Sequence, residues 1–191
     1  MASDWKKFFL GQLYEFRSGL SKPRSAFGSG YPFLSFKDVF YNSAVPELNE
    51  LVNSTDSERC NCSIRRGDVF LTRTSETMDE VGMSSVALCD IPNATFNGFT
   101  KRLRSKDTEI VIPEYARYYF RSPAFRQEVT AMSSMSTRAS LNNEMLGRLS
   151  ITVPPCDEQK AIGHILGSLD DKIGLYPSFS KAINFISIIF S

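Results

Sequence analysis

Near the end of this 191-residue chain, a strand-like segment, a double proline and a helix with regular apolar spacing follow one another. The apolar run 149–153 is typical of a strand, and Pro154-Pro155 ends it because proline cannot donate to a sheet ladder. Asp157 then provides a helix N-cap. Apolar residues recur on the following helix in a 4-3-4-3 spacing, at Ile162, Leu166, Leu169, Ile173 and Tyr176. This spacing predicts a coiled-coil-type helix that packs against another helix.

This segment also divides the chain. We expect one domain over residues 1–153 and a separate helical element over 154–191, with a break near Pro177. Within the first part, strand patterns such as 69–72 are followed by an aromatic helix that begins at Pro113. The sequence therefore predicts an α+β domain with a twisted mixed β-sheet and packed helices, followed by the coiled-coil-type helix.

Composition excludes several classes of protein. The contents of 42% hydrophobic and 23% charged residues are ordinary for a soluble globular protein. No apolar run is long enough to span a bilayer, and the first residues lack the apolar core of a signal peptide, so we expect a cytoplasmic protein without membrane contact. Cys60 and Cys62 are too close together for the usual zinc spacing, and His164 is the single histidine, so we expect no metal site.

The chain lacks a recognisable catalytic set. Val153 and Cys156 flank the double proline, whereas the adenine methyltransferase loop has Asn or Asp before it and an aromatic residue after it. No phosphate-binding loop motif is present. Asp170 and Asp171 are adjacent on a predicted helix and point about 100° apart, so they cannot easily share a metal ion. We expect no catalytic residue and no cofactor in this chain.

Three stretches of the sequence resemble one family, the specificity (S) subunits of type I restriction-modification systems. The first is 9–13 with 18–22, and the second is 67–75 with Val81-Gly82. The third is Pro154-Pro155 followed by 158–162 and 169–173. Each motif is short, but together, in this order and spacing, they extend the resemblance over nearly the whole chain.

The resemblance implies an architecture and partners. An S subunit resembles two half-units in tandem, each with a target-recognition domain and a spacer helix, and each domain reads one half of a bipartite site on double-stranded DNA. This chain has one such unit, so the resemblance implies a half-length subunit that pairs with a second half-subunit or forms a homodimer. It also implies a methyltransferase (M) subunit that uses S-adenosylmethionine and a restriction (R) subunit that uses ATP and Mg²⁺. After Ile173 the chain departs from the family pattern, because Pro177 and a nearly uncharged ending replace a charged helix.

DNA contacts require cations, hydroxyls and amides on exposed loops. The net charge of +1 is low for a nonspecific DNA-binding protein, so local clusters have to supply them. Loops 18–30 and 133–143 offer this mixture, and family placement supports them. The predicted DNA-binding residues are Ser21, Lys22, Arg24, Lys37, Arg73, Ser75, Lys101, Arg102, Arg138, Ser140, Asn142 and Asn143. The predicted subunit interface consists of the five apolar helix residues named above.

Two alternatives remain open. These loops can be ordinary polar loops, and the chain can be a non-DNA protein-interaction module that uses the C-terminal helix. Separately, an aromatic set can stack on bases, but its helical spacing after Pro113 favours core packing. The set is Tyr115, Tyr118, Tyr119, Phe120 and Phe125.

Overall fold

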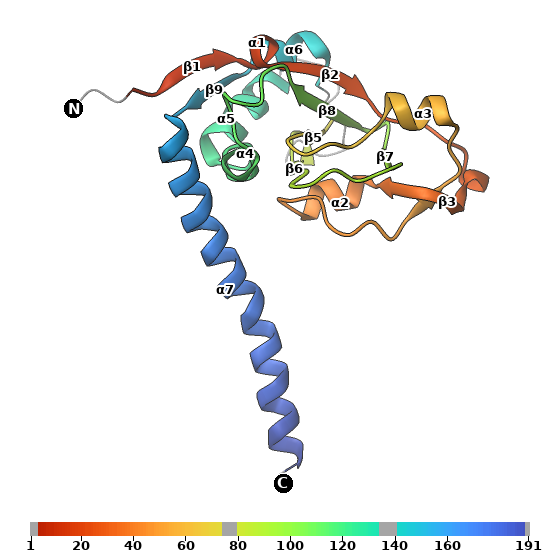
Figure 1. Ribbon diagram of the computed structural model, residues 1–191, viewed down its shortest axis with the longest axis vertical. Helices are drawn as coiled ribbons and strands as arrows, with labels where there is room; N and C mark the ends of the chain where they lie inside the picture. The colour runs from red at the N-terminus through yellow and green to blue at the C-terminus, as the bar shows by residue number, and fades with distance from the viewer. Residues whose placement is uncertain (1–3, 74–79, 134–140, 190–191) are drawn as a thin grey trace.

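The computed structural model describes residues 4–73, 80–133 and 141–189, with side chains as far as Ile173. Figure 1 shows a folded unit from which one long helix, α7 (Cys156–Ile189), projects. The predicted α+β class with packed helices is confirmed, and its strands are distributed over three sheets.

The central sheet is antiparallel, and its strand order is β2-β8-β5-β6. Its strands are β2 (Tyr14–Ser18), β8 (Thr100–Ser105), β5 (Val69–Thr72) and β6 (Ser84–Val86). Side chains of β5 alternate between two apolar clusters, with Val69 and Leu71 in one and Phe70 in the other. The sheet therefore separates two cores.

Helices cover the first core. They are α1 (Leu10–Leu13), α4 (Pro113–Tyr119), α5 (Pro123–Ser133) and α6 (Asn143–Arg148). Phe120 and Phe125 are fully buried in it, with ring centroids 4.9 Å apart, and Tyr115 packs beside them. Core packing of these aromatic side chains is confirmed, since burial removes them from any base-stacking surface.

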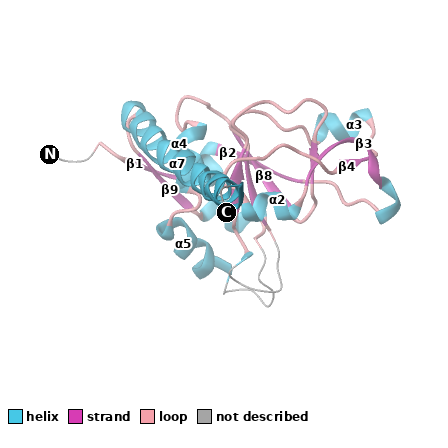
Figure 2. Ribbon diagram, turned by 90° about the horizontal axis from the view of Figure 1, so that it is seen from below, coloured by secondary structure: helices cyan, strands magenta, loops and turns pink. Residues whose placement is uncertain are grey.

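A smaller sheet covers the second core and lies at the far end from α7 (Figure 2). Its strands are β4 (Leu51–Val52), β3 (Phe27–Leu34) and β7 (Thr95–Phe96), and β3 pairs with β7 in parallel. The 3₁₀ turn η1 (Arg24–Ala26) precedes it, and α2 (Phe36–Tyr41) and α3 (Asp56–Asn61) accompany it. Ser35 and Thr55 form capping boxes that start these two helices.

Strand β3 begins inside the region that the sequence predicts as a loop, 18–30. Its register shifts between Phe27 and Tyr31, and Gly30 has a φ of 106°. A Cβ at Gly30 would lie 2.5 Å from the Val52 carbonyl oxygen, so only glycine fits this bulge. The glycines that suggest a loop therefore belong to an irregular strand.

A two-stranded antiparallel sheet joins β1 (Lys6–Phe9) to β9 (Ser150–Val153). It brings the start of the chain against the segment that leads into α7 (Figure 1). Strand β9 follows the predicted run 149–153 closely, and Asn142 caps the preceding helix α6, accepting a hydrogen bond from the Met145 N–H at 2.8 Å. The chain therefore turns through a short helix before β9.

The long helix differs from prediction at one point. The predicted break near Pro177 is absent, and α7 runs without interruption from Cys156 to Ile189. A proline inside a helix removes one backbone hydrogen bond and crowds the preceding turn, so it weakens a helix without necessarily ending it. The division of the chain between residues 153 and 154 stays a prediction. No described helix is long and apolar enough to cross a membrane.

Candidate nucleic-acid interface

Four polar side chains from distant parts of the sequence meet where β2 and β5 end and β8 begins. Ser18 and Lys101 are register partners across β2 and β8, and Arg73 directly follows β5. The Arg73 guanidinium donates to Ser18 Oγ at 3.5 Å, and Lys101 Nζ donates to Asn143 Oδ1 at 2.7 Å. We call these four residues the strand-end cluster.

The strand-end cluster concentrates positive charge. Lys101 is only 7% exposed, and burial, together with the nearby Arg73 charge, lowers its pKa. Within the described part of the chain, neither cation forms an ion pair with a carboxylate. As far as the structure describes the chain, the cluster combines two cations and an amide with no carboxylate partner, which suits a polyanion with hydrogen-bonding edges.

A second polar group lies on the opposite face of the same sheet. Arg104 forms a two-pronged pair with buried Asp68, with nitrogen–oxygen distances of 2.6 and 2.8 Å. Arg102 donates to the Ser63 carbonyl at 2.6 Å, and its guanidinium lies 5.6 Å from the Phe96 ring centroid. We call Arg102, Arg104, Asp68 and Ser63 the arginine cluster.

Arg102 stays a predicted DNA contact, although it lies on the other face of the sheet from Lys101. It is buried, and burial and the charge of Arg104 lower its pKa to about 10. Its contacts hold the chain that leaves α3 against β8. Because alternate residues of a strand face opposite sides, Lys101 and Arg102 cannot both join one surface.

The other predicted DNA contacts lie on several elements. Ser21, Arg24 and Lys37 are exposed, on the segment after β2, on η1 and on α2 respectively. Lys22 instead pairs with Glu58 at 2.6 Å, and the hydrogen bond from Lys22 lowers the pKa of Glu58. Asn142 is exposed while it caps α6.

Three predicted contacts, Ser75, Arg138 and Ser140, lie outside the described residues. Of the predicted contacts, the structure thus brings together Arg73, Lys101 and Asn143, and it adds Ser18, which sequence reasoning missed. The signal for Ser18 was its place at the end of an edge strand, which becomes informative only once the pairing with β8 is known.

Comparison with known proteins agrees with the resemblance. The chain matches the family model described as the type I restriction modification DNA specificity domain over residues 2–178. The chain belongs to this family. It is 24% identical over 155 residues to the EcoKI specificity subunit of Escherichia coli K12, covering 81% of this chain and 33% of that protein.

Solved structures have the same fold. The HsdS subunit from Thermoanaerobacter tengcongensis matches with a TM-score of 0.62 at 20% identity, over 91% of this chain and 39% of that one. The S subunit from M. genitalium gives 0.63 at 13% identity, over 93% and 42%. A chain from a type I R-M system studied for complex assembly gives 0.66 at 21% identity, over 92% and 40%. The specificity domain described here therefore spans about two fifths of these chains.

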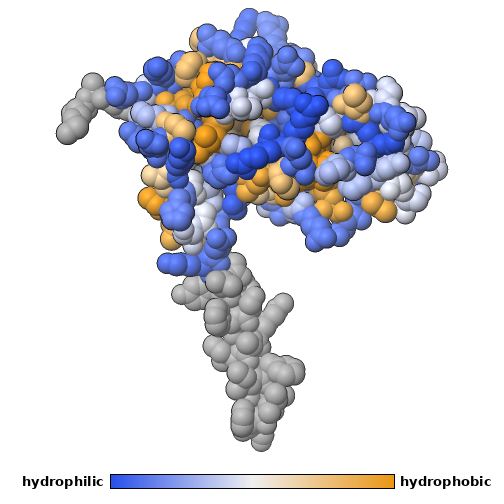
Figure 3. Space-filling view, viewed as in Figure 1, coloured by the Kyte–Doolittle hydropathy of each residue, from blue (hydrophilic) through white to orange (hydrophobic). Residues whose placement is uncertain are grey.

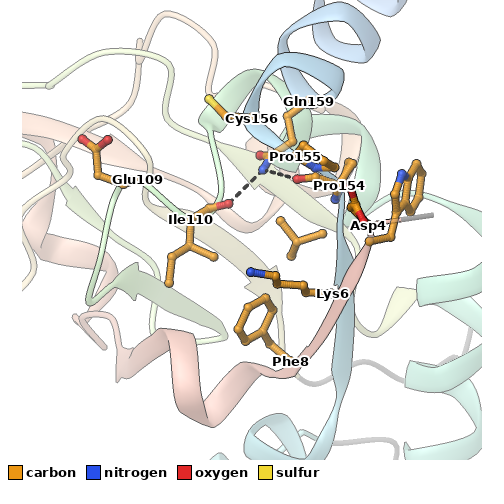
Figure 4. Close-up of a pocket in the computed structure, with 11 residues that line it drawn as sticks. Asp4, Lys6, Phe8, Glu109, Ile110, Pro154, Pro155, Cys156 and Gln159 are labelled. Atoms are coloured by element: carbon orange, nitrogen blue, oxygen red, sulfur yellow. Dashed lines mark hydrogen bonds between the residues drawn. The ribbon is translucent and has the colours of Figure 1, made fainter. Parts of the chain in front are cut away.

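The motif Pro-Pro followed by Glu-Gln, part of the family resemblance, has a clear structural role. Gln159 is buried on the first turn of α7, and its side-chain amide donates to the carbonyls of Ile110 and Pro154, both at 2.9 Å. It also accepts from the Ile112 N–H at 2.9 Å. Figure 4 shows this side chain directed toward Ile110 and Pro154 above a groove of about 810 Å³. Gln159 thus fixes the start of α7 to the specificity domain.

Further contacts continue along α7. A Cβ at Gly163 would lie 2.9 Å from Glu114 Cβ, so the helix approaches α4 closely at this point. Asp170 accepts from the Arg117 guanidinium at 2.8 Å and from the Tyr118 hydroxyl at 2.9 Å. One face of α7 is therefore occupied by the domain.

The predicted interface residues divide between two environments. Ile162 packs against the first core and Leu166 is half-buried, whereas Leu169 and Ile173 are exposed together with Ile165. Apolar side chains are visible along the outer edge of this part of α7 in Figure 3. The side chain of Tyr176 lies outside the described residues. The outer stripe, defined as Ile165, Leu169 and Ile173, is available for another helix.

The cysteines and the possible metal-binding side chains are the remaining candidates for chemistry. The four cysteines are free thiols, with Cys62 buried. Among the described residues, no group of three or more His, Cys, Asp or Glu side chains is placed to hold a metal ion.

Proposed function

We propose that this chain recognises DNA sequence for a type I restriction-modification system, reading one half of a bipartite site without performing chemistry itself. The observation that carries the proposal is the strand-end cluster. Among the described residues its two cations have no carboxylate partner, and Asn143 adds an amide beside them. A duplex phosphate would supply the missing negative charge, and a base edge would pair with an amide or a guanidinium.

The surroundings of the cluster support this proposal. Segments 74–79 and 134–140 join the described chain beside Arg73 and Leu141, and the Leu141 N–H donates to the Arg73 carbonyl at 2.9 Å. Those segments contain Ser75, Arg138 and Ser140, which lie outside the described residues and stay predicted contacts. Exposed Ser21 and Asn142 add donors and acceptors.

The partners are part of the same proposal. The outer stripe of α7 binds the spacer helix of a second half-subunit or of a second copy, and residues 1–153 and 154–191 act as recognition and spacer units. An M subunit with S-adenosylmethionine flips and methylates the target adenine, and an R subunit with ATP and Mg²⁺ completes the assembly. The resemblance to specificity subunits and the exposed Leu169 and Ile173 support this arrangement.

Co-expression with the host M subunit tests the proposal. We expect the tagged chain to retain the M subunit in a pull-down, and methylome sequencing to show a methylated adenine motif, palindromic and split by a spacer. Arg73→Ala should lower methylation, while Lys106→Ala, one residue beyond the far end of β8, should leave it unchanged. Association without methylation, although both proteins are folded, would contradict DNA recognition by this chain.

The outer stripe also favours a second candidate, a protein-interaction module that does not bind DNA. This candidate predicts association through α7 but no retention of duplex DNA at low salt, whereas a recognition domain retains it.

A further inference from the structure

Phe99 is a large apolar side chain exposed beside the strand-end cluster. It lies in the turn between β7 and β8, and it is 61% exposed. A single exposed apolar residue needs no explanation by itself, so its meaning depends on how it is held and what surrounds it.

The turn that carries Phe99 is fixed from two sides. The Gly98 N–H donates to the Leu20 carbonyl at 2.7 Å, and the Arg73 N–H donates to the Phe99 carbonyl at 2.9 Å. Within the turn, Asn97 Oδ1 accepts from the Phe99 N–H at 2.7 Å. The backbone under the ring is therefore ordered before any partner binds, which reduces the entropy cost of using it as a contact.

Predicted DNA contacts adjoin the turn that carries the ring on either side. A Cβ at Gly98 would lie 2.5 Å from Ser21 Oγ, so the segment after β2 presses against the turn. On the other side, the hydrogen bond from Arg73 links Phe99 to the strand-end cluster, and Lys101 follows two residues later. A partner that covers this ring also meets two cations that have no carboxylate partner in the described part of the chain, so charge complementarity selects a polyanion over an apolar protein surface.

We propose that the Phe99 ring contacts the face of a base in bound duplex DNA, as an apolar wedge at one base step. This inference rests on the proposed function and adds a residue to it. Proteins that insert Phe or Leu between bases unstack one step and bend the duplex, which creates sequence preference where the stack opens readily.

The test uses the full chain. Its ligand is a duplex that the chain selects from a pool of randomised duplexes of about 40 base pairs. We expect Phe99→Ala to weaken binding to this duplex by about 10-fold or more, since an aromatic side chain on a base contributes about 1–3 kcal/mol. The dependence of log affinity on log salt should stay unchanged because no charge is removed. Phe99→Trp should keep most of the affinity. Equal affinities for wild type and Phe99→Ala would overturn the inference while DNA recognition stands.

A spectroscopic readout separates base contact from a structural role. With 2-aminopurine placed in turn along the selected duplex, the wild type should raise its fluorescence at one step, and Phe99→Ala should not. Phe9→Ala is the matched control, because Phe9 is also exposed, at 53%, but lies on β1. It should leave affinity and fluorescence unchanged, and a response equal to that of Phe99→Ala would overturn the inference. Failure of the wild type to select or retain any duplex would overturn DNA recognition and this inference together.

Discussion

Lys101 and Arg102 are neighbours on β8, yet they belong to two polar regions with different surroundings. The strand-end cluster around Lys101 has hydrogen-bond partners but no counter-ion among the described residues. The arginine cluster around Arg102 holds its own carboxylate, Asp68, and the Ser63 carbonyl. The two clusters, which share strand β8, therefore differ in whether a described carboxylate of the protein neutralises part of their positive charge.

The difference indicates which region is free to bind an external anion. A guanidinium that is buried against backbone carbonyls stabilises the fold, and a ligand would have to break those contacts to reach it. Lys101 is as buried as Arg102, at 7% against 6% exposed, but its described partners are neutral, so it gains an interaction when a phosphate reaches it. Four sets of variants can break or sharpen this comparison.

Removing the internal carboxylate should have the largest effect on stability. Asp68→Ala leaves Arg104 without its paired anion, so we expect the free energy of unfolding to fall by about 3 kcal/mol. Urea unfolding followed by circular dichroism measures this. DNA affinity per folded molecule should stay unchanged, and a loss of affinity in fully folded protein would mean that the arginine cluster also faces DNA.

Arg102→Met and Lys101→Met form a matched pair on one strand. Arg102→Met should lower the free energy of unfolding by about 1–2 kcal/mol, because the Ser63 carbonyl loses its donor. Lys101→Met should lower it by less than about 1 kcal/mol and reduce DNA affinity by about 10-fold. Urea unfolding and fluorescence anisotropy with the selected duplex separate the two effects, and a reversed pattern would refute the assignment of the clusters.

Arg73→Ala tests whether the charge of the strand-end cluster acts on phosphate. We expect affinity for duplex DNA to fall by several-fold and the salt slope to decrease by about 1, since one phosphate contact is lost. Anisotropy titrations from low to moderate salt measure the slope. An unchanged slope with reduced affinity would instead indicate a base contact.

The smallest effect is expected for Lys22, a predicted DNA contact whose ammonium forms an ion pair with Glu58. Glu58→Gln frees the ammonium, so we expect DNA affinity to rise about 2-fold, within the range of an exposed ion pair. The pKa of Glu58 is lowered in the folded state, so its stabilising contribution is present above the unfolded value of about 4.3 and is lost as pH falls through the folded value. Thermal melts from pH 3 to 7 should show a larger decrease in the wild type than in Glu58→Gln, in which the other paired carboxylates still titrate.

The spacing of apolar residues and the positions of proline and of helix-capping residues predicted much of the fold. The buried strand β5 and the aromatic core around Phe120 follow from local pattern, because burial repeats with the period of each element. Helix α7 begins at Cys156, so Asp157, the predicted N-cap, lies inside its first turn. Helix α3 was not predicted, because its segment has no apolar stripe with helical spacing. The local signal for its start is the capping box that Thr55 forms with Glu58.

The candidate site was predicted only in part, for a physical reason. Whether Lys101 or Arg102 faces the strand-end cluster depends on which of two neighbouring residues points to which side of β8, and that depends on pairing with β2 and β5. Phe99 lies in a turn that is held by Leu20 and Arg73, which are distant in sequence. The register between strands that are distant in sequence therefore decides which residues belong to this interface. One sequence does not reveal that register.

The Gln159 attachment gives α7 the properties of a lever. With 34 residues, the helix is about 50 Å long at the usual rise of about 1.5 Å per residue. Gln159 holds the first turn to Ile110, Ile112 and Pro154, and Asp170 holds the helix again to Arg117 and Tyr118. About 29 Å of helix lies beyond Asp170 at the same rise, so a rotation of about 10° there displaces the far end by about 5 Å. These two attachments thus set how far from the recognition domain, and in which direction, anything carried by this helix is placed.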